Sequence, residues 1–213
     1  KLAAIDATAA EIDLLDGLSR GSILYGNASA ATTILTKGTA DQVLTSDGTD
    51  ISWTTASSGG ITESDIWRIT ADITSDVNPI SSNLERADNA SFGYLGTGMS
   101  VSSGLWTFPS TGLWQVSFNF ATSSTTADNH AMQLYATINN SAYAVIAYSY
   151  VGVTGSSAAG NQGTAFGQAN VNVTNTTNVK VKFAAGSIGG GAISGDTAAN
   201  LTAFYFTRLG DSV

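Results

Sequence analysis

Hydrophobic and polar residues alternate most clearly between positions 113 and 121, and this alternation sets the first structural expectation. The bulky positions are Trp114, Val116, Phe118 and Phe120. The intervening polar positions are Gln115, Ser117 and Asn119. A period of two predicts a β-strand with one apolar face. Pro109 and Gly112 separate it from a second apolar piece at 104–108, so the stretch predicts two strands joined by a Phe-Pro-Ser-Thr-Gly turn.

Short apolar segments continue along the rest of the chain between Gly-, Asn- and Ser-rich turns. They predict strands at 66–73, 91–95, 104–108, 113–121, 131–138, 142–151, 164–173, 178–185 and 199–208. This regular spacing predicts an all-β fold, a sandwich or jelly roll, over residues 61–213. The last strand is apolar on both faces, with Leu201, Ala203 and Tyr205 opposite Phe204 and Phe206. A strand of this kind needs a cover, which predicts a subunit contact through Leu201, Ala203 and Tyr205.

The first 20 residues predict one short helix. Thr8 and Glu11 form a capping box, and Gly17 ends the pattern. Ile12 and Leu15 lie three residues apart on one face, and isolated helices need roughly 12–15 residues to be stable. This face therefore packs either on its own domain or in a bundle with other copies of the chain, which makes Ile12 and Leu15 candidate interface residues.

Residues 21–53 alternate short apolar pieces with turn residues, and Asp47-Gly48 predicts a β-hairpin. Four such pieces cannot close a core in one copy, but several chains meeting along an axis could close one. We therefore expect a trimerising stalk segment at 1–53, a Ser/Gly linker at 54–60 and a head at 61–213. Because the chain opens at Lys1 without Met or a signal peptide, we also expect it to be a piece of a longer protein.

The charge distribution is uneven. Residues 1–88 carry 13 acids and five bases, which accounts for the net charge of −8, and residues 89–213 carry three of each. A chain with so few bases offers no basic patch for nucleic acid. It has no cysteine for disulfides or thiolate metal sites, and no apolar run of 18 residues for a membrane span.

The order of signals in residues 64–210 resembles the C1q-like domains of the tumour necrosis factor-like jelly-roll superfamily. The resemblance rests on Phe108, Pro109 and Gly112 leading into an aromatic strand, and on the apolar C-terminal strand. It implies a homotrimeric head. The segments "ATAAEIDLLDG" and "GTADQVLTSDGTDISW" are similar to parts of bacteriophage tail-fibre proteins. Together they imply a virion fibre, attached through its N-terminal end to other virion proteins.

The residues argue against catalysis. His130 is the only histidine, and beside Asp128 it could enter a hydrolytic triad, but no Gly-x-Ser-x-Gly elbow accompanies it. Glycoside hydrolysis needs paired carboxylates, whereas Asp128, Asp196 and Asp211 are far apart in the sequence. We expect no cofactor. Calcium at a trimer axis stays open, because no local Asp-x-Asp-x-Asp run supplies six to eight oxygens.

Counting hairpins back from the last strand predicts that the loops at 122–130, 152–163 and 186–197 lie at the end of the head farthest from the stalk. They hold the candidate receptor-binding residues, which are Asp128, Asn129, His130, Asn161, Gln162 and Asp196. The sequence thus predicts a non-enzymatic, extracellular fibre tip that binds a glycan or protein on a bacterial host. The alternatives are a purely structural virion fibre or decoration protein and a glycan depolymerase.

Overall fold

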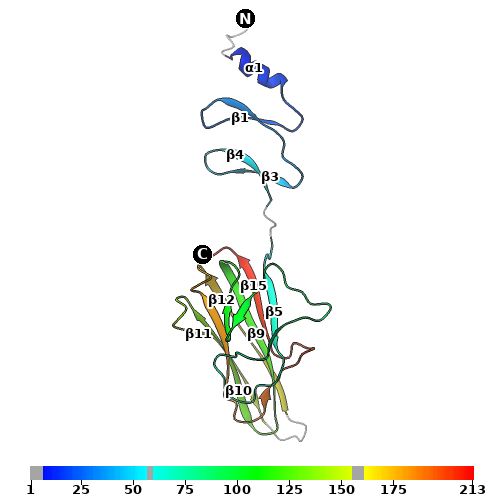
Figure 1. The fold of residues 1–213 in the computed structure, drawn as a ribbon, viewed down its shortest axis with the longest axis vertical. Coiled ribbons are helices and arrows are strands. Elements are labelled where there is room, and N and C mark those ends of the chain that lie inside the picture. The colour runs from blue at the N-terminus through cyan, green and yellow to red at the C-terminus, as the bar shows by residue number, and fades with distance from the viewer. Residues whose placement is uncertain (1–6, 57–59, 155–160) are drawn as a thin grey trace. The chain divides into compact units, whose positions relative to one another are not determined.

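The computed structural model describes residues 7–56, 60–154 and 161–213. These form two compact units divided between residues 59 and 60 (Figure 1). Among the described residues, the only helix has eight residues and is not long enough to cross a membrane.

The first unit consists of one helix and two hairpins. Helix α1 spans Ala9–Asp16, and the predicted capping box is present: the Thr8 side chain accepts from the Glu11 amide, and Glu11 reaches back to the Thr8 amide. The hairpins are β1 (Ile23–Gly26) with β2 (Thr32–Leu35), and β3 (Gln42–Ser46) with β4 (Ile51–Thr55). The predicted linker therefore starts later than residue 54, because Thr54 and Thr55 belong to β4. Its residues 57–59 lie outside the described part.

No residue of this unit is buried within 7–56. The candidate interface residues Ile12 and Leu15 are 49% and 59% exposed. The second hairpin also leaves Val43 and Leu44 on the surface. Local hydrogen bonds define these elements, but a single copy gives them no core.

The second unit is a sandwich of two antiparallel sheets (Figure 1). One sheet has the order β11-β10-β13-β8-β7, from strands Ala144–Val153, Asp128–Thr137, Lys180–Gly186, Leu105–Thr107 and Ser100–Ser102. The other has the order β12-β9-β15-β5-β6, from strands Asn161–Val173, Gly112–Ser124, Ala203–Gly210, Ser64–Ile69 and Leu84–Arg86, with β14 (Ala192–Ile193) paired to β9. This arrangement confirms the all-β, jelly-roll expectation.

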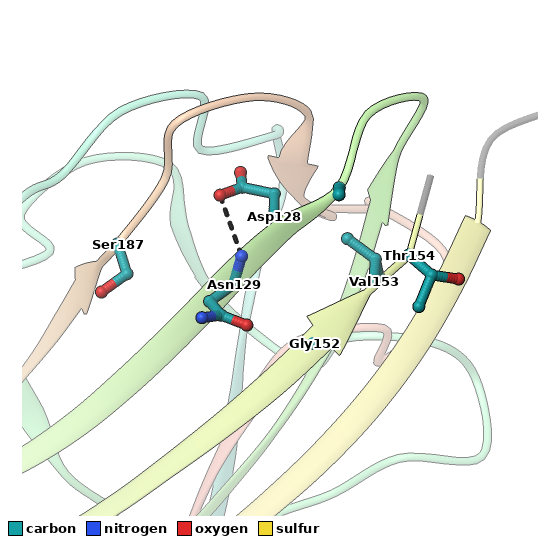
Figure 2. Close-up of a pocket in the computed structure, with 7 residues that line it drawn as sticks. Asp128, Asn129, Gly152, Val153, Thr154 and Ser187 are labelled. Carbon is teal, nitrogen blue, oxygen red and sulfur yellow. Dashed lines mark hydrogen bonds between the residues drawn. The ribbon is translucent and has the colours of Figure 1, made fainter. Parts of the chain in front are cut away.

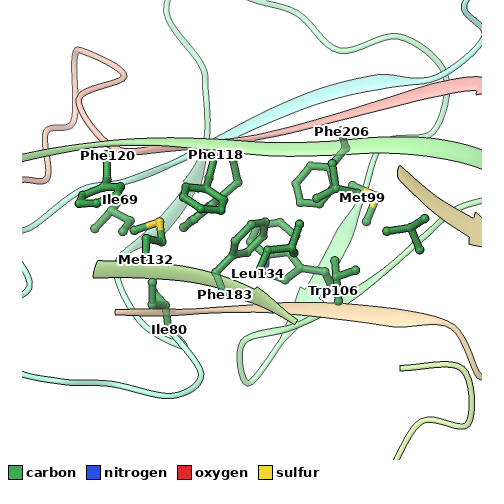
Figure 3. Packing of buried hydrophobic residues seen from close by; sticks show 14 of the residues in the cluster. Ile69, Ile80, Met99, Trp106, Phe118, Phe120, Met132, Leu134, Phe183 and Phe206 are labelled. Carbon is green, nitrogen blue, oxygen red and sulfur yellow. The ribbon is translucent and has the colours of Figure 1, made fainter. Parts of the chain in front are cut away.

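The core lies between the sheets and is rich in aromatic rings (Figure 3). Trp106 is fully buried, with its ring centroid 5.1 Å from Trp67 and 5.0 Å from Phe206. Phe183 stacks on Phe204 at 4.0 Å. The alternating bulky residues of β9 all point into this core, as their spacing predicts.

The Phe-Pro-Ser-Thr-Gly turn carries the chain from one sheet to the other, from β8 to β9. Across it, Phe108 and Trp114 approach to 5.1 Å, and the Trp114 indole donates to the Ser110 carbonyl. Gly112 has φ of +146°, and a Cβ there would lie 2.5 Å from the Gly210 carbonyl oxygen. Trp106 and Trp114 are therefore aromatic anchors on opposite sheets, joined by a corner that requires glycine.

Three details of the strand prediction were wrong. Residues 91–95 form no strand, since only Leu95 makes an isolated bridge, to Ser64, and Gly96 takes φ of +77° directly after it. The short strands β6, β7 and β14 were missed, because two or three residues carry no readable period. The last strand begins at Ala203, so Leu201 lies outside it.

Candidate binding site

Strand pairing fixes the two ends of the sandwich. Ser64, where the head begins, lies beside Thr207, and Gly210 lies beside Leu113. At the other end, Asp128 pairs with Val153, and Asn161 pairs with Ser124. We call these the base end and the loop end. The described parts of the loops at 122–130 and 152–163 therefore meet at the loop end, as hairpin counting predicts; residues 155–160 lie outside the described part.

The loop end carries an open hollow of about 700 Å³ (Figure 2). It is lined by Ala127, Asp128, Asn129, Gly152, Val153, Thr154 and Ser187. Strands β10 and β11 supply most of these residues, and Ser187 comes from the glycine-rich segment that follows β13. All of the lining residues lie in the three predicted loops at 122–130, 152–163 and 186–197, but of these residues only Asp128 and Asn129 were named as candidates.

Asp128 holds the glycine-rich segment in place. Its carboxylate accepts hydrogen bonds from the amides of Gly189 at 3.1 Å and Gly190 at 2.7 Å, and from the Asn129 amide at 2.9 Å. Burial acts to raise the pKa of Asp128, but the bonds from Gly190 and Asn129, together with His130, outweigh it and lower that pKa. Asp128 is thus a carboxylate whose oxygens are already engaged within the chain.

The other predicted binding residues have different positions. His130 is fully buried beneath the hollow, so it cannot touch a ligand directly. Asn161 and Gln162 lie in β12 at the loop end, paired with Ser124 and Ser123 of β9, and do not line the hollow.

Asp196 is separate from this hollow. Its amide donates to the Ile69 carbonyl at 2.8 Å, and its side chain accepts from the amides of Ala198 and Ala199. These two bonds, and the charge of Arg68, lower the pKa of Asp196 despite the opposing effect of burial. Asp196 shapes the turn before β15 and is not among the residues that line the hollow.

A second hollow, of about 550 Å³, lies on the outward face of the larger sheet. Its lining residues are Gln115, Ser117, Asn119, Phe166, Gln168, Tyr205 and Thr207. The Tyr205 hydroxyl donates to Asn119 at 2.7 Å, and burial raises the pKa of this tyrosine. Of the three predicted contact residues in the last strand region, only Tyr205 lines this hollow. Ala203 is fully buried within its own chain, and Leu201 is 40% exposed.

Exposed apolar side chains gather on the two neighbouring edge strands. They are Val145, Ile146, Tyr148 and Tyr150 of β11 and Phe166 of β12. The two strands contact each other across the sandwich, where the Ser149 hydroxyl donates to the Phe166 carbonyl. Tyr150 and Phe166 are 57% and 58% exposed, so this edge leaves large apolar groups in water.

No metal centre is evident within one copy. Among the residues that the structure describes, no three His, Cys, Asp or Glu side chains come together in a way that could hold an ion. A calcium site built from several copies was left open by the sequence and stays untested.

Comparison with known proteins defines the fold. No family model matches the chain, and no curated protein matches it in sequence. Among solved structures, murine APRIL is similar at 10% identity and a TM-score of 0.50, over 69% of this chain and 99% of that one. The tumour necrosis factor Eiger from S. frugiperda has 11% identity and a TM-score of 0.49, over 70% of this chain and 94% of that one. The head thus has a jelly-roll β-sandwich fold similar to that of murine APRIL.

Proposed function

We propose that the protein is the tip of a bacteriophage fibre, a homotrimer that binds a bacterial host surface and has no catalytic role. The observation that carries this proposal is the N-terminal unit, which has secondary structure but no buried residue from 7 to 56. An isolated helix of eight residues and two-stranded hairpins are at best marginally stable in water. Neighbouring copies covering Ile12, Leu15, Val43 and Leu44 would supply the missing core.

The head offers complementary surfaces for the same assembly. One surface is formed by the exposed apolar side chains of β11, and the other is the hollow of about 550 Å³ that Phe166 and Tyr205 line. Two different patches that fit one another make a head-to-tail contact, which closes into a ring when the rotation permits it. Three such contacts would bury the exposed β11 side chains of each copy against the hollow beside Tyr205 of the next.

The loop-end hollow is the proposed adhesion site. Binding residues are commonly found on loops that a rigid scaffold positions, and this sandwich carries Asn129, Thr154 and Ser187 as exposed polar groups around one hollow. A glycan or protein of the host surface would be the ligand. Three weakly binding copies on one fibre would raise the avidity through effective concentration.

A purely structural virion fibre is the second candidate, and the Asp128 carboxylate favours it. Asp128 is the one carboxylate among the residues that line the hollow, and its oxygens already accept internal hydrogen bonds. The same observation weakens the depolymerase alternative, which needs two carboxylates around one scissile bond. An adhesion site here must therefore act through amide and hydroxyl groups.

Adsorption of the full chain to a panel of bacterial isolates tests the proposal. The wild-type protein should adsorb to at least one isolate. The triple variant Asn129→Ala, Thr154→Ala, Ser187→Ala should lose that adsorption. The turns at 139–141 and 174–177 lie at the base end, because Val173 pairs with Gly112 and Thr137 with Lys180. The matched control changes three exposed residues of these turns, Ser141→Ala, Thr174→Ala and Thr177→Ala, and should adsorb like the wild type.

Light scattering on the same samples should give three times the 21.7 kDa chain mass for all three proteins. A monomeric mass at micromolar concentration contradicts the trimer. If the wild type adsorbs to none of the isolates, adhesion is contradicted and the structural fibre is the remaining candidate. Equal loss in both triple variants places the binding surface elsewhere.

A further inference from the structure

The outward face of the smaller sheet carries a lysine held between two tyrosines. Val181 and Phe183 of β13 belong to the core, so Lys182 between them faces outward. Its ammonium nitrogen lies 5.0 Å from the ring centre of Tyr135, the residue opposite it on β10, and 4.9 Å from that of Tyr143. Aromatic faces attract a cation and hold it in place, but they do not neutralise its charge.

The positive charge of Lys182 has no counter-ion in its own chain. The three arginines of the head each form an ion pair with a carboxylate. Within the described residues, Lys182 forms neither an ion pair nor a hydrogen bond, so its three N–H donors have no protein partner. Lys180, two residues earlier on the same face, donates to the Thr107 hydroxyl at 2.8 Å. This face of an acidic chain therefore offers an anion a local positive charge.

A hollow of about 310 Å³ lies beside this lysine on the same two strands, and its polar side chains are Asp76, Asn78 and Gln133. Gln133 lies two residues before Tyr135 on β10, and the Tyr135 hydroxyl joins the two features. This hydroxyl donates to the side-chain carbonyl of Gln133 and accepts from the side-chain amide of Asn78 at 3.4 Å. The hollow and the ammonium of Lys182 are thus parts of one surface, with Tyr135 between them.

The groups of this surface match a sugar. With their bonds to Tyr135 in place, Gln133 keeps its NH₂ group and Asn78 keeps its carbonyl oxygen, so together they can donate to and accept from neighbouring hydroxyls. Small-molecule sites have volumes of roughly 300–1,000 Å³, and a hollow at the lower end of this range suits a single sugar ring.

The charges of this surface indicate where an acidic group on the sugar would lie. Asp76 is the carboxylate that lines the hollow, and it accepts the Ile188 amide at 2.8 Å. A ligand carboxylate inside the hollow would be repelled by Asp76, whereas over Lys182 it would form charge-assisted hydrogen bonds. The hollow therefore favours the uncharged ring of the ligand, and Lys182 favours its carboxylate.

We infer that the outward face of the smaller sheet binds an acidic polysaccharide, with a sugar ring between Asn78 and Gln133 and a carboxylate on Lys182. These residues do not belong to the surfaces proposed for contact between copies, so the site stays open in the trimer. They are also distinct from the residues that line the loop-end hollow. That the polysaccharide belongs to a host surface rests on the proposed function, whereas the binding itself does not.

Calorimetric titration of the full chain with a galacturonic acid tetrasaccharide tests the inference. The wild type should bind this tetrasaccharide, and should bind its fully methyl-esterified form at least tenfold more weakly, because the ester carries no charge. Lys182→Gln should weaken binding of the acidic form at least tenfold, and Lys182→Arg should retain it. Equal binding of the acid and the ester by the wild type, or binding of neither, overturns the inference.

Lys37→Gln is the matched control, because it removes the same charge from an exposed residue of the first unit. It should bind the tetrasaccharide like the wild type, and thermal melts verify that the head of each variant is folded. An equal loss in Lys37→Gln and Lys182→Gln would mean that net charge governs binding, which overturns the site.

The adsorption assay separates this inference from the proposed function. The loop-end triple variant should still bind the tetrasaccharide after it has lost adsorption to cells. If the wild type binds the tetrasaccharide through Lys182 but adsorbs to no isolate, the saccharide site stands and the proposed function is wrong. If it adsorbs to an isolate but does not bind the tetrasaccharide, the proposed function stands and the saccharide site is wrong.

Discussion

The N-terminal unit and the head use opposite sources of order. The first unit has a capped helix and two hairpins whose hydrogen bonds join residues close in sequence, yet nothing from 7 to 56 is buried. The head joins distant segments, such as β5 with β15, around a core of packed aromatic rings. Local signals can specify elements without making them stable. A core can make a fold stable even where its local signals are faint.

Separating the two units should have the largest effect. A chain of residues 61–213 should fold with the same thermal midpoint as the head in the full chain, because its core is complete. A chain of residues 1–60, diluted to submicromolar concentration, should lose its secondary structure. Circular dichroism over a dilution series measures both. A structured, monomeric 1–60 chain would remove the difference between the units.

A matched tryptophan pair sharpens the comparison. Trp106→Ala should cost the head about 3–5 kcal/mol, because it empties the centre of the aromatic core. Trp53→Ala in the first unit removes a half-buried ring, whose indole donates to the Thr36 carbonyl, and should leave the stability of the head unchanged. Denaturant unfolding followed by near-ultraviolet circular dichroism distinguishes them. Equal losses would mean that the two units unfold together.

A matched aspartate pair applies the comparison to charge. Hydrogen bonds lower the pKa of Asp47 in the exposed hairpin, and at Asp128 they also prevail over burial. A carboxyl whose pKa is lowered on folding contributes stability above its ordinary pKa, and this is lost as the pH falls through the lowered value. Asp128→Asn should cost the head about 2 kcal/mol at pH 7, since three backbone amides lose a charged acceptor.

The same variant should flatten the decline of head stability in acid, while Asp47→Asn should leave the head's pH profile unaltered. Thermal melts from pH 2 to pH 7 measure both. If the stability of the Asp128→Asn head instead declined in acid as steeply as that of the wild type, the Asp128 carboxylate would contribute nothing to stability.

The helix cap gives the smallest expected effect. Thr8→Ala removes the side-chain acceptor of the capping box and should cost the helix about 1 kcal/mol. Because no buried core stabilises α1, the change should reduce the helical signal in far-ultraviolet circular dichroism. The melting point of the head should stay unchanged. Thr39→Ala is the control within the same unit, because only its backbone makes a hydrogen bond there.

Strong periodic signals in the sequence predicted the fold of the head. The alternation from Trp114 to Phe120 identified the strand that pairs with both β12 and β15, and Pro109 with Gly112 marked the corner. The short strands β6, β7 and β14 were missed because their place is set by their neighbours. The helix cap and the Asp47-Gly48 hairpin were predicted because each is defined by interactions within about four consecutive residues.

The candidate site was only partly predictable. Hairpin counting brings Asp128 and Asn129 to the loop end, since strand direction alternates. It could not reveal that His130 points inward, because a residue beside a turn can begin a buried face. It also could not separate Asp196 from the hollow, since a long loop can place its two ends on different sides of a sandwich. The positions of His130 and Asp196 are both determined by contacts between residues that are distant in the sequence.

The position of β5 has a consequence for how the chain is made. This strand opens the head, but in the finished sheet it lies between β6 and β15, and β15 is the last strand of that sheet in chain order. One edge of β5 therefore remains unpaired while more than a hundred further residues are synthesised. Unpaired edges invite contact with other chains, and contacts between distant residues form slowly. Newborn heads emerging side by side are thus most exposed to mispairing in the interval before their final strand appears.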